Sequence, residues 1–138
     1  MTNLSYLIIK ASRHLKNKLD KALMEYDITA AQFSVIIQIH SSRLPITSAE
    51  ISERLGSDRP TISGIINRLE KKGMVLKVAN PKDKRSSYLE ICKECNKLVE
   101  KMKTISDELT IEIFSIYSNE EAKQLTEMIC KLNEGNEE

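Results

Sequence analysis

The sequence predicts a mainly α-helical fold that carries one small β-hairpin. Three observations support this prediction. Apolar residues recur at helical spacing over most of the 138-residue chain, capping signatures precede several of these segments, and two short stretches alternate with the period of a strand on either side of a turn. Within residues 47–91 the order is helix, tight turn, helix and hairpin. That order is typical of a winged helix-turn-helix.

The first helix of this central segment is expected to begin at a capping box. Thr47 supplies the hydroxyl and Glu50 the carboxylate, which together satisfy backbone amides left without partners at a helix start. Ile51 and Leu55 then share one face. Gly56 is expected to end the helix, because glycine readily adopts the left-handed conformation found there.

The second helix is expected to begin at Ser57 or Asp58, with Pro60 in its first turn, where the missing amide hydrogen costs nothing. Four apolar residues recur at i, i+3, i+4 and i+7 and form one buried stripe: Ile62, Ile65, Ile66 and Leu69. The remaining face is polar, partly small and partly basic, as expected of a helix in a DNA major groove. Its candidate DNA-binding residues are Arg59, Pro60, Thr61, Ser63, Gly64, Asn67 and Arg68.

The hairpin is expected to consist of strands over 74–79 and 87–91, joined by a turn that begins Asn80-Pro81. Lys82, Lys84 and Arg85 place three cations within four residues at its tip. Such a tip can reach a phosphate ridge or a minor groove, where the potential is most negative. Solvated surface charges are the alternative. The position directly after a capped helix pair favours DNA binding.

Charge is unevenly distributed along the chain, although the formal net charge is only +1. Residues 68–85 contain seven basic and two acidic side chains, a net charge of +5, whereas residues 118–138 contain six glutamates and two lysines, a net charge of −4. A basic patch on a nearly neutral protein indicates a local nucleic-acid-binding surface rather than general coating of nucleic acid. The acidic C-terminal part is expected to face away from DNA.

The flanks of the central segment are predicted to be helical and to join two copies of the chain. Apolar stripes run from Leu4 to Leu23, from Leu98 to Ile116 and from Ala122 to Leu132. One small winged lobe (residues 30–92) cannot bury all three, so we expect dimerisation helices over about 3–26 and 93–134 within a single domain, 1–138. A symmetric dimer would present two recognition helices to a palindromic site. A monomer with a self-contained helical cap is the alternative.

The sequence gives little support for a membrane protein, a secreted protein or an enzyme. No stretch is long and apolar enough to span a bilayer, and no secretion signal is predicted, so a cytoplasmic location and no membrane partner are expected. An odd number of cysteines, Cys92, Cys95 and Cys130, suits reduced thiols there. The four scattered glycines form no phosphate loop, and no hydrolase or metalloprotease motif occurs, so neither an enzyme nor a cofactor is expected.

These features resemble the MarR-type (multiple antibiotic resistance) regulators of bacteria and archaea over nearly the whole chain. The resemblance rests on Leu55-Gly56, on 58–69 as recognition helix, on Leu69-Glu70-Lys71-Lys72-Gly73, and above all on the run from Asn80 to Arg85 leading into Leu89. That run is similar to the wing signature of the family, in which an Asp and an Arg lie two apart and a Leu follows four later.

The resemblance implies a dimer of winged lobes that binds double-stranded DNA and commonly represses efflux, detoxification or virulence genes. It matches Arg85 to a wing arginine that enters the minor groove, Asp58 to an acidic residue that pairs with it, and Thr61 and Ser63 to DNA-facing positions. With Asp58, Asp83 is expected to orient the cations. Members are often released from DNA by small phenolic or lipophilic effectors. Candidate residues for an effector pocket where the winged lobe meets the dimer helices are Arg13, Phe33, Ile37 and His40, which are equally suited to the core.

Two alternatives remain open at this stage. Cys92 and Cys95 form a C-x-x-C that would serve a redox- or metal-responsive regulator, although no second Cys or His pair with zinc-like spacing follows and no metal site is expected. The family's peroxide sensors carry a reactive cysteine in the first helix, and residues 4–26 contain none. A protein-interaction module that keeps the winged fold without binding DNA is the other alternative, against which the basic wing tip argues.

Overall fold

The computed structural model describes residues 3–135. The chain divides into two compact units, residues 1–105 and 106–138, and the division falls inside one helix. The elements of the first unit are α1 (Leu4–Ala22), a 3-10 turn (Met24–Tyr26), α2 (Ala30–Ser41), β1 (Ile46–Thr47), α3 (Ser48–Leu55), α4 (Arg59–Lys71), β2 (Val75–Ala79), β3 (Ser87–Ile91), a second 3-10 turn (Lys93–Cys95) and the beginning of α5 (Asn96–Ile113). Helices therefore predominate, as the sequence predicted.

The sheet is antiparallel and has three strands in the order β1-β3-β2. The predicted hairpin is confirmed: β2 pairs with β3 from Val75 opposite Ile91 to Ala79 opposite Ser87. The sequence analysis did not anticipate β1, whose two residues pair with the other edge of β3, Ile46 opposite Leu89. A strand of two residues has no periodicity to detect. It nevertheless fixes the base of the hairpin beside the start of α3.

The ends of α3 and α4 follow the predicted capping chemistry, with one correction. Thr47 Oγ1 accepts a hydrogen bond from the Glu50 amide at 3.3 Å. The return bond of a capping box, in which the Thr47 amide would donate to the Glu50 carboxylate, is not found at this helix; Oε1 of Glu50 accepts from the Thr47 hydroxyl at 3.1 Å instead. Gly56 and Gly73, which follow α3 and α4, have φ values of 65° and 77°, the left-handed conformation that glycine adopts without strain.

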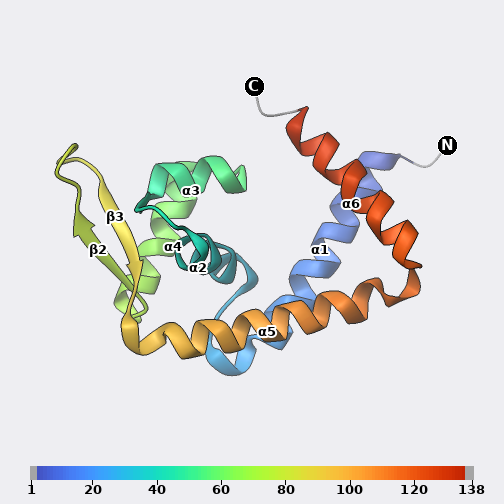
Figure 1. Cartoon of the computed structure of the whole chain (residues 1–138), viewed down its shortest axis with the longest axis horizontal. Helices are drawn as coiled ribbons and strands as arrows, with labels where there is room; N and C mark the ends of the chain where they lie inside the picture. The colour runs from blue at the N-terminus through green and yellow to red at the C-terminus, as the bar shows by residue number, and fades with distance from the viewer. Residues whose placement is uncertain (1–2, 136–138) are drawn as a thin grey trace. The chain divides into compact units, whose positions relative to one another are not determined.

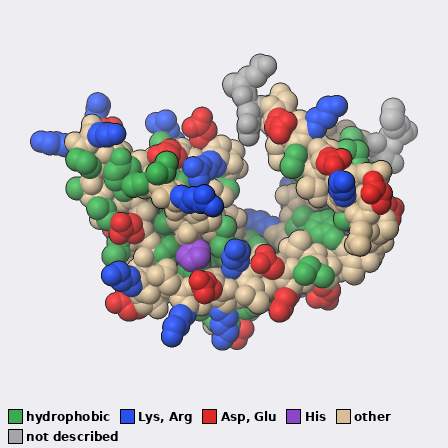
Figure 2. Space-filling model, in the orientation of Figure 1, with side chains coloured by type: hydrophobic (Ala, Val, Ile, Leu, Met, Phe, Trp, Pro, Cys, Tyr) green, Lys and Arg blue, Asp and Glu red, His purple; other side chains and the backbone are tan. Residues whose placement is uncertain are grey.

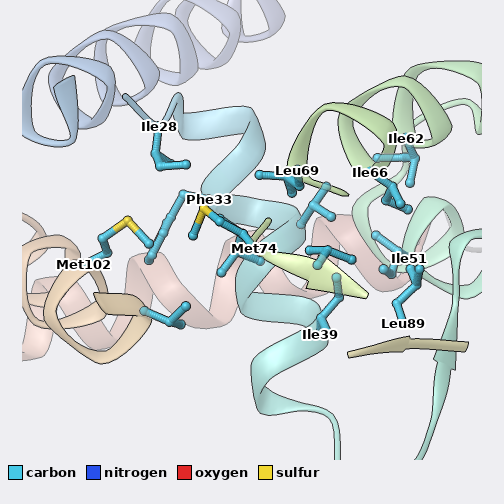
Figure 3. Packing of buried hydrophobic residues seen from close by; sticks show 14 of the residues in the cluster. Ile28, Phe33, Ile39, Ile51, Ile62, Ile66, Leu69, Met74, Leu89 and Met102 are labelled. Carbon is cyan, nitrogen blue, oxygen red and sulfur yellow. The ribbon is translucent and has the colours of Figure 1, made fainter. Parts of the chain in front are cut away.

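The hydrophobic core lies between α2, α3, α4, the sheet and the start of α5 (Figure 3). From α4 it receives Ile62, Ile66 and Leu69, so the predicted stripe is confirmed, with Ile65 partly buried at its edge. The core is aliphatic apart from Phe33, and its other members include Val35, Ile36, Ile39, Ile46, Ile51, Met74, Val75, Leu89, Val99 and Met102. Burial of this set fixes α4 in place and leaves its opposite face exposed.

α1 and α6 (Asn119–Glu134) both lack buried residues, unlike α2, α3, α4 and α5. The apolar side chains of α1 at Leu4, Leu7, Ile8 and Leu15 are exposed. Only its C-terminal end is anchored: Leu19 packs on the core, and Asp20 accepts a 2.6 Å hydrogen bond from the Ala30 amide at the start of α2. The body of α1 thus presents an apolar surface.

The second unit contains the remainder of α5, a 3-10 turn (Phe114–Ile116) and α6 (Asn119–Glu134). α6 begins at a capping signature of the kind that precedes several helical segments of the sequence: the Glu121 amide donates to Ser118 Oγ at 3.1 Å, and the Glu121 carboxylate accepts from the Ser118 amide at 2.9 Å. Met128 and Ile129 of α6 are exposed. Within residues 3–135, no helix is long and apolar enough to cross a membrane.

Candidate nucleic-acid interface

α4 presents the polar face that its sequence predicted. All seven candidate residues on this helix are exposed: Arg59, Pro60, Thr61, Ser63, Gly64, Asn67 and Arg68. A Cβ atom added at Gly64 would meet nothing within 4 Å, so packing within the chain does not require a glycine there. A small residue in the middle of an exposed helix face leaves room for a partner to approach the backbone closely.

Asp58 caps α4 instead of pairing with the wing. Its carboxylate accepts from the Thr61 amide at 2.8 Å and from the Thr61 hydroxyl at 2.9 Å. Ion pairs found within residues 3–135 do not include Asp58, so the pairing with Arg85 that the resemblance implied is not seen. Because Thr61 donates its single hydroxyl proton to Asp58, its oxygen is left to act as an acceptor.

Hydrogen bonds from the Thr61 amide and then from its hydroxyl hold the pKa of the Asp58 carboxyl below its ordinary value. The stability that this ionised cap contributes is therefore fully present above the unfolded pKa of about 4. It is lost as the pH falls through the lower folded-state pKa. At neutral pH the ionised Asp58 carboxylate therefore caps the start of α4.

The wing loop is ordered by its own side chains. Asn80 Oδ1 accepts from the Lys82 amide at 2.9 Å, and Asp83 Oδ1 accepts from the Arg85 amide at 2.9 Å. Asp83 also lies 3.9 Å from Nε of Arg85, whose side chain is 96% exposed. Lys82 and Lys84 are exposed too, and basic side chains gather at this tip (Figure 2). The loop therefore presents three cations on a braced turn.

Figure 1 shows the hairpin projecting from the helices with its tip free of them. α4 contacts both α3 and β2, so the polar helix face and the hairpin belong to one packed unit. The Ser48 hydroxyl of α3 lies 3.5 Å from the Ser63 hydroxyl of α4, which places one candidate base-reading group against the preceding helix.

Lys72, just after α4, connects the recognition helix to the junction of α1 and α2. Its ammonium donates to the backbone carbonyl of Asp27 and lies 3.5 Å from the carboxylate of the same residue. It also lies 3.4 Å from Oε1 of Gln32, a buried side chain that completes the capping box of α2. Sequence periodicity gave no sign of this contact, because Lys72 and Asp27 are 45 positions apart.

The effector-pocket candidates lie in different surroundings. Phe33 is buried in the core, Ile37 is partly buried against it, and Arg13 is exposed on α1. Only His40 among the four lines an open hollow of about 340 Å³ beside the end of α2. The other residues of that hollow are Ile39, Ser42, Arg43, Leu44, Pro45, Leu89, Glu90, Ile91 and Asn96.

Cys92 is held as a thiol. Its Sγ donates to Oε2 of Glu94 at 2.6 Å, and this hydrogen bond raises the pKa of Cys92 while it lowers the pKa of Glu94. Since the thiolate is the reactive form, this surrounding disfavours redox chemistry at Cys92. No group of three metal-ligating side chains occurs within residues 3–135.

We expect Glu94→Ala to accelerate alkylation of Cys92, because the substitution removes both the acceptor that retains the proton and a nearby negative charge. A several-fold increase at pH 7 should be measured by iodoacetamide trapping with peptide mass spectrometry. The exposed Cys130 of the same protein serves as internal control and should react at an unchanged rate. Equal Cys92 rates in the two proteins would contradict this role for Glu94.

Comparison with known proteins gives a consistent result. The MarR family model matches residues 28–87, which include α2, α3, α4, β2 and the wing loop, and it ends at the first residue of β3. Over 98 residues the chain is 37% identical to the multiple antibiotic resistance protein MarR of Escherichia coli K12, an alignment that covers 62% of this chain and 67% of that protein.

Solved structures agree over nearly the full length. A crystal structure of the S. aureus MepR–DNA complex superimposes with a TM-score of 0.88 at 26% identity, covering 98% of this chain and 99% of MepR. Wild-type apo MarR from E. coli gives 0.78 at 26% identity, with coverage of 96% and 98%. CouR from Rhodococcus jostii bound to p-coumaroyl-CoA gives 0.83 over 94% and 91%, but at 18% identity it shares the fold alone.

Proposed function

The chain belongs to the MarR family of transcriptional regulators, and from this premise we propose that it is a repressor that binds a palindromic operator as a homodimer and is released by a small-molecule effector. One observation carries the DNA-binding part of the proposal. The same packed unit presents an exposed polar helix, α4, and a wing whose three cations are exposed. Major-groove readout and backbone neutralisation need these two surfaces.

Two further observations support the proposal that the protein binds DNA as a dimer. MepR, to which this chain is similar over nearly its full length, has been crystallised with DNA. α1 exposes apolar side chains along its length, as does α6, and soluble proteins usually cover such surfaces. A second copy of the chain that covers them would provide two recognition helices related by a two-fold axis, which matches an inverted repeat.

Fluorescence anisotropy with a duplex containing an inverted repeat from the regulated promoter tests this proposal. We expect binding about a thousandfold tighter than to a random duplex at physiological salt. Replacement of a base-reading residue, such as Ser63→Ala or Asn67→Ala, should cost about 1–3 kcal/mol and relax the preference at one position in each half-site. Equal weakening on specific and random duplexes would assign that residue to the phosphate contacts. Indistinguishable wild-type affinities for the two duplexes would contradict sequence-specific regulation.

We propose in addition that a small lipophilic or phenolic ligand controls release. The hollow beside α2 joins apolar side chains of Ile39 and Leu44 with the guanidinium of Arg43, which could hold the carboxylate of an aromatic acid; the imidazole of His40 and the carboxylate of Glu90 also line it. It adjoins β3, the central strand of the wing sheet. A ligand bound in this hollow would contact β3, the strand that positions the wing.

The effector proposal is tested by titrating salicylate, as a simple phenolic acid, into the protein–operator complex. Dissociation that Arg43→Ala suppresses, while operator affinity without ligand stays at the wild-type value, is the expected result. If Arg43→Ala leaves the response unchanged, the hollow is not the site through which salicylate acts. Absence of a response in the wild type would contradict this choice of ligand.

A further inference from the structure

Lys77 joins the wing to the recognition helix. Its side chain extends from β2, and Nζ donates a 2.8 Å hydrogen bond to Oδ1 of Asn67 on α4. The same ammonium lies 3.5 Å from Oε1 of Glu70, one turn further along α4. The Lys77 and Glu70 side chains are 37% and 44% exposed, so this cation rests between strand and helix instead of projecting into solvent as Arg85 does.

The contact fixes the orientation of the Asn67 amide. An ammonium only donates hydrogen bonds, so it selects the oxygen of the amide over the nitrogen. The oxygen of Asn67 therefore faces Lys77, and its NH₂ group points away from that contact. Glu70 strengthens this choice because its carboxylate holds the ammonium in place by opposite charge.

Asn67 lies on the exposed face of α4, four residues after Ser63 and hence on the same side of the helix. An asparagine that is free to turn can present both amide groups to adenine, as an acceptor for N6 and a donor to N7. With its oxygen already bonded to an ammonium, Asn67 has its two N–H donors available. Such a group matches the acceptors N7 and O6 of guanine or O4 of thymine, and it matches the N4 donor of cytosine poorly.

We propose that Lys77 determines which base Asn67 reads, by holding the amide with its donor side towards DNA. Lys77 is thus a positioning residue that acts through Asn67, and the inference rests on the proposed function, since it presumes that α4 lies in the major groove. The wing then has two roles. Its tip contacts DNA, and its strand β2, through Lys77, determines the base preference of α4.

The test compares full-length wild type with Lys77→Met, Lys77→Arg, Asn67→Ala and the Lys77→Met/Asn67→Ala double variant. Each binds a set of operators in which every base pair of one half-site, and its symmetry mate, is replaced in turn. Lys97→Met, which removes an exposed lysine of α5, is the charge-matched control. Anisotropy at two salt concentrations gives affinities and salt slopes, and thermal unfolding gives stability.

We expect the wild type to prefer guanine or thymine at one position by about tenfold, within the usual range for a single base contact. Lys77→Met should reduce this preference to about twofold or shift it towards adenine, with the salt slope retained. Lys77→Arg should restore the preference because it remains a donor. In the Asn67→Ala background, Lys77→Met should change nothing further at that position.

Other results would overturn the inference. Weakening by Lys77→Met on all operators with a shallower salt slope would make Lys77 a phosphate contact. Weakening on all operators with a lower melting temperature and an intact base preference would make it a structural brace only. A Lys77→Met protein with the wild-type preference removes the inference and leaves the proposed function in place. A wild type without any operator preference removes both.

Discussion

A protein in which Ile8 and Leu15 of α1 are both replaced by Glu is expected to sediment as a monomer, whereas the wild type is expected to sediment as a dimer. The two residues are one heptad apart on the exposed apolar stripe of α1. A carboxylate buried without a partner costs several kcal/mol, and a symmetric interface would bury four of them. That sum exceeds the roughly 12 kcal/mol that holds a nanomolar dimer together.

Analytical ultracentrifugation at micromolar concentration measures this result, with circular dichroism to confirm retention of helix. Asn17→Glu is the control for position: it adds one carboxylate two residues after Leu15, on the opposite side of the helix. These two substitutions test the dimer interface more specifically than deletion of residues 1–25 would. That truncation would also delete Leu23, which is fully buried, and Asp20, which binds the Ala30 amide. If the double variant is folded and remains dimeric, the dimer interface does not include this stripe of α1.

Much of the fold could be predicted because its signals are local. The buried stripe of α4, the capping signatures that precede several helices and the glycine after α3 each depend on residues within one or two turns. The hairpin was predictable for the same reason, since a strand's period and a turn beginning Asn80-Pro81 lie in one short stretch.

Features that depend on distant pairing were not predictable. β1 exists because Ile46 meets Leu89, 43 positions further along the chain, and two residues cannot show a period. Lys72 and Lys77 both read as surface cations in the sequence, and only the fold brings them to Asp27 and Asn67. Asp58 illustrates a competition that a motif cannot resolve: the carboxylate bonds to Thr61, at the start of its own helix, instead of to the wing.

The sequence therefore predicted which residues of α4 are exposed, but not which of their polar groups neighbouring side chains leave free. Exposure of the polar face of α4 follows from burial of its apolar face, which periodicity reveals. Side chains that contact α4 determine which of its polar groups remain free to bind a partner. Thr61 has donated its proton, Ser63 lies against Ser48, and Asn67 is held by Lys77. Such neighbours determine the chemistry offered to a base.

Arg85→Ala is expected to weaken operator binding by about ten- to a hundredfold without affecting the fold. The guanidinium is almost fully exposed at the end of a braced loop, so it is available to enter a minor groove, where negative potential is concentrated. The substitution leaves intact the bond from the residue 85 amide to Asp83, which orders the loop. The loss should therefore fall on DNA binding and not on the wing's conformation.

Anisotropy on the operator at several salt concentrations measures this effect. If Arg85 neutralises one phosphate, the slope of log K against log salt should become shallower by about 0.9 for each subunit. If it lies in the minor groove, affinity should fall more on operators with an A·T-rich segment under the wing than on G·C-rich ones, because narrow A-tract grooves attract arginine most strongly. Lys123→Ala, an equal loss of charge on α6, should bind as the wild type does. A folded Arg85→Ala protein with unchanged affinity and salt slope would exclude the wing arginine from DNA recognition.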